Sequence, residues 1–199
     1  MRFARYTLAA ALALSSLTGF AQQRDYKDTY KPADAEKAMA PAAALDVMLS
    51  QLEVQVMRAA EAMPANKYNF APTTAEFASG SPAKYDGVRT FAQQLTHIAG
   101  ANYFFYGKLG NAKPPIDPKA IAAMTGKGDI IGALKQSFAF AHAQIASMKP
   151  ADAFTTIEGA DGMHTPVTLA AFGVAHGYDH YGQLVEYLRM NGIVPSGSK

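Results

Sequence analysis

The sequence predicts an all-α protein, a four-helix bundle with long connections before its second and fourth helices. Apolar residues make up 49% of the 199 positions and charged residues only 17%, which suits one domain with a single buried core. In four long segments apolar side chains recur at steps of three and four residues, the spacing of a helix with one buried face. Strand-like alternation of apolar and polar residues is nearly absent, so the layers of the fold are expected to be helices.

The first expected helix has its buried stripe from Leu45 onward and stops at Pro64, because proline cannot continue a helix. Off its buried stripe lie Val47, Val54 and Met57, which suggest a second apolar surface and a homodimer contact. The stripe itself is expected to consist of Leu45, Met48, Leu49, Leu52, Val56, Ala59 and Met63.

The second expected helix begins after Thr90, whose side chain can form a capping box with that of Gln93. It follows a polar connection at residues 65–88, which is rich in proline, serine, threonine and glycine. A short helix is then expected, with Asp117 as its N-cap and an end near Gly126.

The third long helix is expected to start at about Asp129 and to be closed by Pro150. After a second long polar connection, Thr165 is the expected N-cap of the fourth helix, which ends at about Met190. Gly192 is well placed for the left-handed conformation that ends many helices.

The first 21 residues have the features of a secretory signal peptide. Arg2 and Arg5 precede an apolar run at residues 8–17, and small residues then lead to an expected cleavage site after Ala21. The run is short for a bilayer, so no stable membrane anchor is expected after cleavage, and the mature protein should be periplasmic or secreted. The expected division of the chain is a signal peptide at 1–21, a polar tail at 22–40, the helical bundle at 41–195 and a C-terminal tail at 196–199.

Composition excludes several classes of function. The chain has no cysteine, so disulfides, thiolate metal ligands and cysteine nucleophiles are ruled out. Arg2 and Arg5 are the only charged residues before the expected cleavage site, so the mature chain carries equal numbers of basic and acidic side chains. Its basic residues do not cluster, and no nucleic-acid partner is expected.

The histidines are the strongest chemical signal. His176 and His180 are four residues apart on the expected fourth helix, so their imidazoles lie on one face, one turn apart, where both can reach one metal ion. For a third ligand, spacing leaves both His97 and His142 open, because each lies at the edge of the apolar stripe of its helix. His164 lies in a connection about three turns from His176, too far to join the same ion.

Two segments resemble a known family. Residues 88–103 read Val-Arg-Thr-Phe-Ala-Gln-Gln-Leu-Thr-His-Ile-Ala-Gly-Ala-Asn-Tyr, and residues 176–195 contain His-Gly-Tyr-Asp-His followed by Tyr-Gly-Gln-Leu and Tyr-Leu-Arg. Together they closely resemble the DinB-like superfamily of bacterial four-helix-bundle proteins, over residues 45–195.

That resemblance implies one divalent metal ion, most often nickel or zinc, bound by one histidine of the second helix and two of the fourth. In this chain those positions are His97, His176 and His180, so the resemblance favours His97 over His142. Three neutral imidazoles leave coordination positions open, as in catalytic rather than structural metal sites.

The resemblance implies a metal-dependent enzyme, a hydrolase or transferase that uses metal-bound water or a thiol on a small-molecule substrate. Asp179, Asn102 and Tyr178 are the candidates for side chains that support the metal or the reaction. Because low-molecular-weight thiols are chiefly cytoplasmic, the expected export favours hydrolysis. The alternative is a non-catalytic module that binds a metal or a small molecule.

Overall fold

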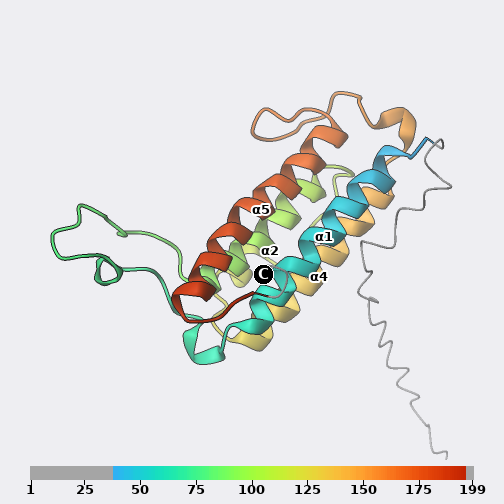
Figure 1. Ribbon diagram of the computed structural model, residues 1–199. Coiled ribbons are helices and arrows are strands. Elements are labelled where there is room, and N and C mark those ends of the chain that lie inside the picture. Colours follow the sequence, from blue (N-terminus) through green and yellow to red (C-terminus); the bar gives the residue numbers. More distant parts are fainter. Residues whose placement is uncertain (1–37, 196–199) are drawn as a thin grey trace, which may run out of the picture.

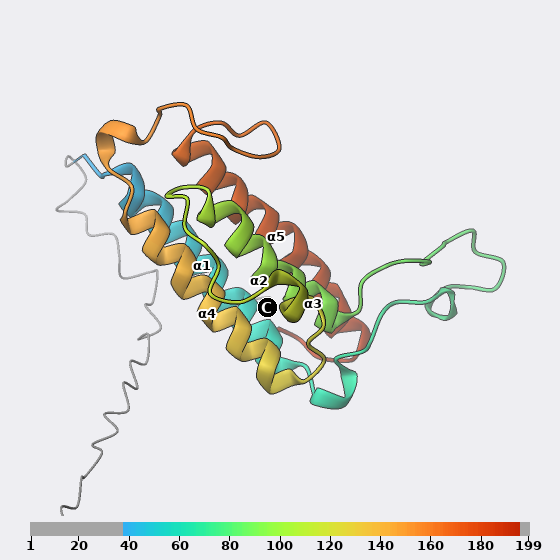
Figure 2. The same ribbon diagram turned by 180° about the vertical axis from the view of Figure 1, so that it is seen from behind.

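The computed structural model describes residues 38–195, in which four long helices lie side by side (Figure 1) and a short one packs beside them (Figure 2). Within that range the only β feature is an isolated bridge between Ala160 and Met163. The all-α prediction is therefore confirmed. The helices are α1 (Pro41–Ala62), α2 (Phe91–Gly107), α3 (Pro118–Ala122), α4 (Lys127–Ala146) and α5 (Pro166–Met190), with short 3-10 turns at Ala65–Lys67, Thr74–Glu76 and Pro150–Asp152.

The expected signal peptide at 1–21, nearly all of the expected tail at 22–40 and the tail at 196–199 lie outside the described residues. Export and cleavage after Ala21 accordingly stay predictions. Within residues 38–195, no helix is long and apolar enough to cross a membrane.

The pairing of the helices explains the two long connections. α1 packs mainly against α4 and α5, and α2 packs against the same two helices, so α1 and α2 lie across the bundle from each other, as do α4 and α5 (Figures 1 and 2). A chain that leaves α1 for α2, or α4 for α5, must therefore cross the end of the bundle. Helices α2 and α4 are direct neighbours, and α3 lies in their connection.

The buried face of α1 differs from the predicted stripe. Met48 is 46% exposed, whereas Val54 and Met57 are each only 5% exposed. Because α1 packs against two helices, its buried face is wider than one stripe and is turned away from Met48. Val54 and Met57 lie inside the bundle of their own chain, so they offer no surface to a second copy. These two residues therefore do not support the expected homodimer.

Several helix ends agree with the sequence. The Thr90 hydroxyl accepts a hydrogen bond from the backbone N–H of Gln93 at 3.2 Å. The side-chain oxygen of Gln93 accepts one from the backbone N–H of Thr90 at 2.9 Å, which confirms the capping box. Gly192 has the expected positive φ of 74°. Helix α4 begins at Lys127, two residues earlier than predicted, and the Lys127 ammonium donates to the carbonyls of Glu61 and Met63 at the end of α1.

Candidate metal centre

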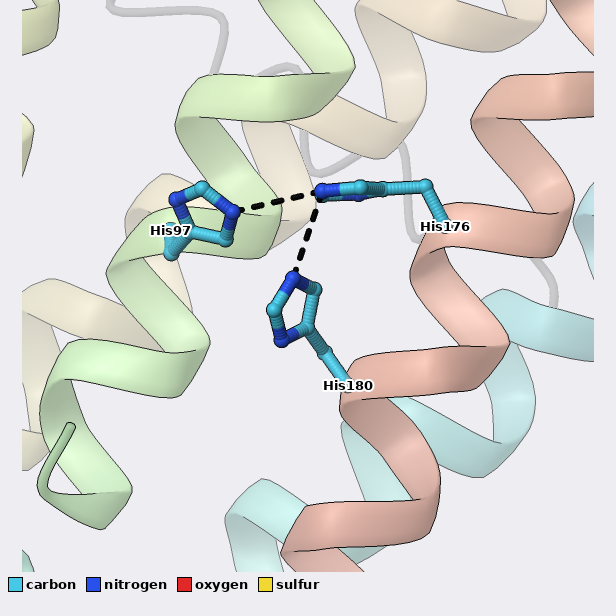
Figure 3. Close-up of side chains that lie close together, drawn as sticks. All are labelled: His97, His176 and His180. Atoms are coloured by element: carbon cyan, nitrogen blue, oxygen red, sulfur yellow. Dashed lines mark hydrogen bonds between the residues drawn. The ribbon is translucent and has the colours of Figure 1, made fainter. Parts of the chain in front are cut away.

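Three imidazole rings meet at the seam between α2 and α5 (Figure 3). His97 comes from α2, and His176 and His180 come from successive turns of α5. The Nε2 atom of His176 lies 3.3 Å from Nε2 of His97 and 3.2 Å from Nε2 of His180. The structure thus brings together the three histidines that the family resemblance implies.

These separations fit coordination of a single ion. Two nitrogens that each lie about 2.0–2.1 Å from a tetrahedral zinc ion are about 3.3 Å apart. All three ligand nitrogens of the cluster lie within 4.8 Å of one another, and no other cluster with this property occurs among residues 38–195. His180 is buried, whereas His97 and His176 are half-buried, so the cluster is open to solvent on one side.

The environment keeps the three rings neutral near pH 7. Burial, together with the positive charge of Arg89 and the neighbouring His176, lowers the pKa of His97 to about 4. Burial and the other two histidines lower the pKa of His180 to about 4 as well. Burial also lowers the pKa of His176, although the charge of Asp179 opposes it. Neutral imidazoles keep the lone pairs that a metal ion requires.

A chain of side-chain hydrogen bonds sets the orientation of His180. Its Nδ1 atom lies 2.8 Å from Oε1 of Gln94, whose Nε2 donates to Oε1 of Gln183 at 2.6 Å. The Gln183 amide in turn lies 3.3 Å from a carboxylate oxygen of Asp179. Because a carboxylate only accepts, it orients both amides, and His180 must carry its proton on Nδ1. Its Nε2 lone pair then points into the cluster, as in metal sites whose ligands are held by outer hydrogen bonds.

Gln94 is the hydrogen-bond partner of the cluster that the sequence did not reveal. It is 1% exposed and lies three residues before His97, on the same side of α2. The three-residue spacing from His97 was a signal in the sequence. It pointed to no particular role, because the partner of Gln94, His180, lies on α5.

The three candidates for supporting residues lie in different places. Asp179 is exposed and reaches His180 through the two glutamines. Asn102 is buried and donates to the Ser137 hydroxyl at 3.1 Å, in the interface of α2 with α4. Tyr178 is half-buried on α5, and its ring meets that of Tyr181. A catalytic role for any of the three stays a prediction.

The remaining histidines lie elsewhere. The Nδ1 and Nε2 atoms of His142 on α4 lie 2.6 Å from a carboxylate oxygen of Asp46 and 3.2 Å from one of Glu53, both on α1. The two carboxylates bind different nitrogens of the ring, so the three side chains do not direct their ligand atoms at a single ion. His164 is exposed in the connection before α5. Of the two histidines that spacing left open, His97 lies with His176 and His180, and His142 does not.

The bundle and its open cluster define a class, an all-α protein with three neutral histidines in a position compatible with binding a divalent metal ion. The family model of the DinB superfamily matches residues 48–184, a segment that contains all three histidines. The chain belongs to the DinB superfamily, as the resemblance implied. No curated protein matches the chain.

Proposed function

We propose that this protein is an exported metal-dependent enzyme that binds one divalent ion, nickel or zinc, through His97, His176 and His180. The observation that carries the proposal is the convergence of three neutral imidazoles at a point that is open to solvent. A bound ion with three protein ligands supplies Lewis acidity to a water molecule or a thiol at its open positions.

Hydrolysis of a small-molecule substrate is the favoured reaction. The expected signal peptide directs the chain away from the cytoplasm, where low-molecular-weight thiols are chiefly found. In this scheme the protein contributes ligand geometry, through the Gln94 hydrogen bond to His180, and partial exclusion of water around the half-buried cluster.

The decisive experiment is metal analysis of untagged protein from the periplasmic fraction, for the wild type and for His97→Ala, His180→Ala and His142→Ala. We expect about one ion per chain in the wild type and in His142→Ala, and a large loss in the other two, with helicity retained by circular dichroism. The His142 variant is the matched control, because its ring also joins two helices without reaching the cluster. Wild-type protein that holds no ion, even after incubation with nickel or zinc, would overturn the proposal.

Catalysis is tested separately on the metal-loaded protein. Ester, amide and thiol-conjugation substrates are screened with and without a chelator, and His176→Ala serves as the inactive control. Turnover that disappears with the chelator and in the variant supports an enzyme. An ion without turnover on any of these classes favours the alternative, a non-catalytic binding module.

Export and cleavage of the signal peptide are tested by the location and the mass of the mature chain. We expect the mature protein in the periplasmic or secreted fraction to begin at Gln22, directly after the expected cleavage site. Intact-mass measurement detects this change directly. A full-length chain retained in the cytoplasm would contradict export and would reopen thiol transfer as the reaction.

A further inference from the structure

Aromatic rings continue from the histidine cluster along α2 and α5. The Phe105 ring centroid lies 5.3 Å from that of His176 and 5.4 Å from that of Phe172, both in edge-to-face geometry. Phe104 extends the row, with its centroid 5.2 Å from that of Phe105. We call Phe104, Phe105 and Phe172 the aromatic shelf.

The aromatic shelf leads from the cluster to solvent. Phe105 is buried and Phe172 is half-buried, whereas Phe104 is 52% exposed. The Lys108 ammonium lies 5.3 Å from the Phe104 centroid, so a positive charge borders the outer end of the shelf. Phe104 is therefore an exposed aromatic ring that continues a buried row, and it offers an apolar group a contact surface next to the cluster.

On α2, Gly100 leaves open space between His97 and Phe104. Gly100 lies one turn after His97 and one turn before Phe104, and a Cβ atom placed on it would meet nothing within 4 Å. Glycine inside a helix is less stable than alanine, and neither close packing nor a positive φ requires it here. A ligand group can occupy the space that Gly100 leaves open beside His97.

The divalent ion of the proposed function is the charge that would attract an anion to the cluster. A dication on three neutral imidazoles keeps its full charge, because no ligand is a carboxylate. Arg89 contributes a positive charge that lowers the pKa of all three histidines, whereas Asp179 and Asp161 contribute negative charges that raise the pKa of His176. The nearest acidic side chain of α5, Asp179, already accepts a hydrogen bond from Gln183.

We propose that the ligand of this site is an amphipathic small molecule, with an anionic oxygen-donor head at the histidine cluster and an aromatic or other apolar group on the shelf. The inference rests on the proposed metal function and adds the class of substrate to it. A ligand ring in the space left by Gly100 can pack against Phe104. It would then extend the row of ring contacts that links His176, Phe105 and Phe172.

The test uses two probes with the same metal-binding head and different apolar groups, acetohydroxamate and benzohydroxamate. Both are titrated calorimetrically into the zinc-loaded mature protein. We expect the wild type to bind benzohydroxamate at least about tenfold more tightly. The preference for benzohydroxamate over acetohydroxamate should fall to about twofold or less in two variants. Phe104→Ala removes the outer ring, and Gly100→Leu fills the open space.

Two matched controls remove similar groups elsewhere. Phe154→Ala truncates a phenylalanine that is 69% exposed in the connection before α5, and Gly132→Leu fills an equally open glycine on α4. Both should keep the full preference. Metal content and circular dichroism are measured for every variant, so that a lost preference is not mistaken for a lost ion or a lost fold.

The outcomes separate this inference from the proposed function. Equal affinity for the two probes in the wild type, or a preference that persists in both Phe104→Ala and Gly100→Leu, would overturn the shelf while the bound ion remains. Protein that holds no ion and binds neither hydroxamate would overturn the proposed function, and the shelf with it.

Discussion

Gln94 holds the candidate metal centre in place although it lies outside the cluster. Its amide joins His180 of α5 to Gln183 one turn further along the same helix, and it is buried while doing so. Buried amide groups without partners are costly, so these hydrogen bonds and the position of His180 depend on each other.

Replacement of Gln94 by leucine should therefore weaken metal binding without removing a ligand. His180 loses the acceptor that fixes its proton on Nδ1, and we expect about 10–100-fold lower metal affinity. Gln94→Glu keeps an acceptor for Nδ1 and should lose less. Competition against a chromophoric chelator measures the affinity, and Gln136→Leu on the exposed side of α4 is the control. Unchanged affinity in Gln94→Leu would show that the hydrogen-bond chain does not position His180.

His142 links α1 to α4 through charge. Burial by itself lowers the pKa of His142, but its hydrogen bonds to Glu53 and Asp46 and their negative charges outweigh burial, so the pKa lies above its usual value. The protonated ring is therefore favoured in the folded protein. A histidine with a raised pKa adds stability that is complete below the pKa of the unfolded chain and is lost as the pH rises through the pKa of the folded state.

The pH dependence of stability should reveal this ion pair. In the metal-free protein we expect His142→Gln to lower the free energy of unfolding by about 1 kcal/mol at pH 6, and by less at pH 8.5. Urea unfolding of wild type and variant at both pH values gives the difference, in which the shared titration of His97 and His180 cancels. A larger loss at pH 8.5 than at pH 6 would contradict the assigned charge state.

At the residue scale, the sequence revealed what depends on local spacing. His176 and His180 share one helix, so their common face followed from a step of four residues. The third histidine of the cluster lies on another helix, and spacing alone left His97 and His142 equal. Gln94 was not predicted, because its partners lie 86 and 89 residues away along the chain.

At the scale of the helix, α5 packs closely against α1 at a glycine that lies between its two histidines of the cluster. Gly177 lies between His176 and His180, on the side that faces α1, and a Cβ atom there would overlap the side chain of Leu52. Leu52 is fully buried and has little room to move. The close approach of α1 and α5 behind the cluster therefore depends on a glycine at this position.

Gly177→Ala should destabilise the bundle by about 1–3 kcal/mol, because overpacking against Leu52 exceeds the gain in helix propensity. Gly182→Ala, on the same helix with open space around it, should instead stabilise by about 0.5–1 kcal/mol. Urea denaturation of the metal-free proteins measures both changes. Equal and favourable effects of the two substitutions would show that α1 does not approach α5 closely at Gly177.

Capping residues were also predicted well, since capping depends on neighbouring residues, whereas the short helix α3 ends at Ala122 and not near Gly126. The Thr90 box, the Asp117 N-cap and Gly192 were all found where the sequence placed them. The buried face of α1 was not predicted correctly, because the exposure of Met48 and the burial of Val54 depend on which two helices α1 contacts. That pairing is a property of the whole bundle and leaves no local signature.

At the scale of the whole molecule, the cluster joins segments that are far apart in the sequence. His97 and His176 are separated by 79 residues, and they meet because α2 and α5 are neighbours in the bundle. Unfolding separates them, and the unfolded chain keeps only the local pair on α5. An ion that needs all three ligands therefore binds the folded state and stabilises it by mass action.

Metal should consequently raise the melting temperature of the chelator-treated protein. At a free concentration about 100 times the dissociation constant, binding adds about 2.7 kcal/mol, which corresponds to about 5–10 °C for a chain of this size. His142→Ala should keep this shift. His97→Ala should lose most of it, because the remaining pair lies on one helix and can bind the ion in partly unfolded chains too. Differential scanning calorimetry with nickel and with zinc measures the shift. If His97→Ala melts with the same metal-dependent shift as the wild type, α5 alone holds the ion, and the seam between α2 and α5 is not a metal centre.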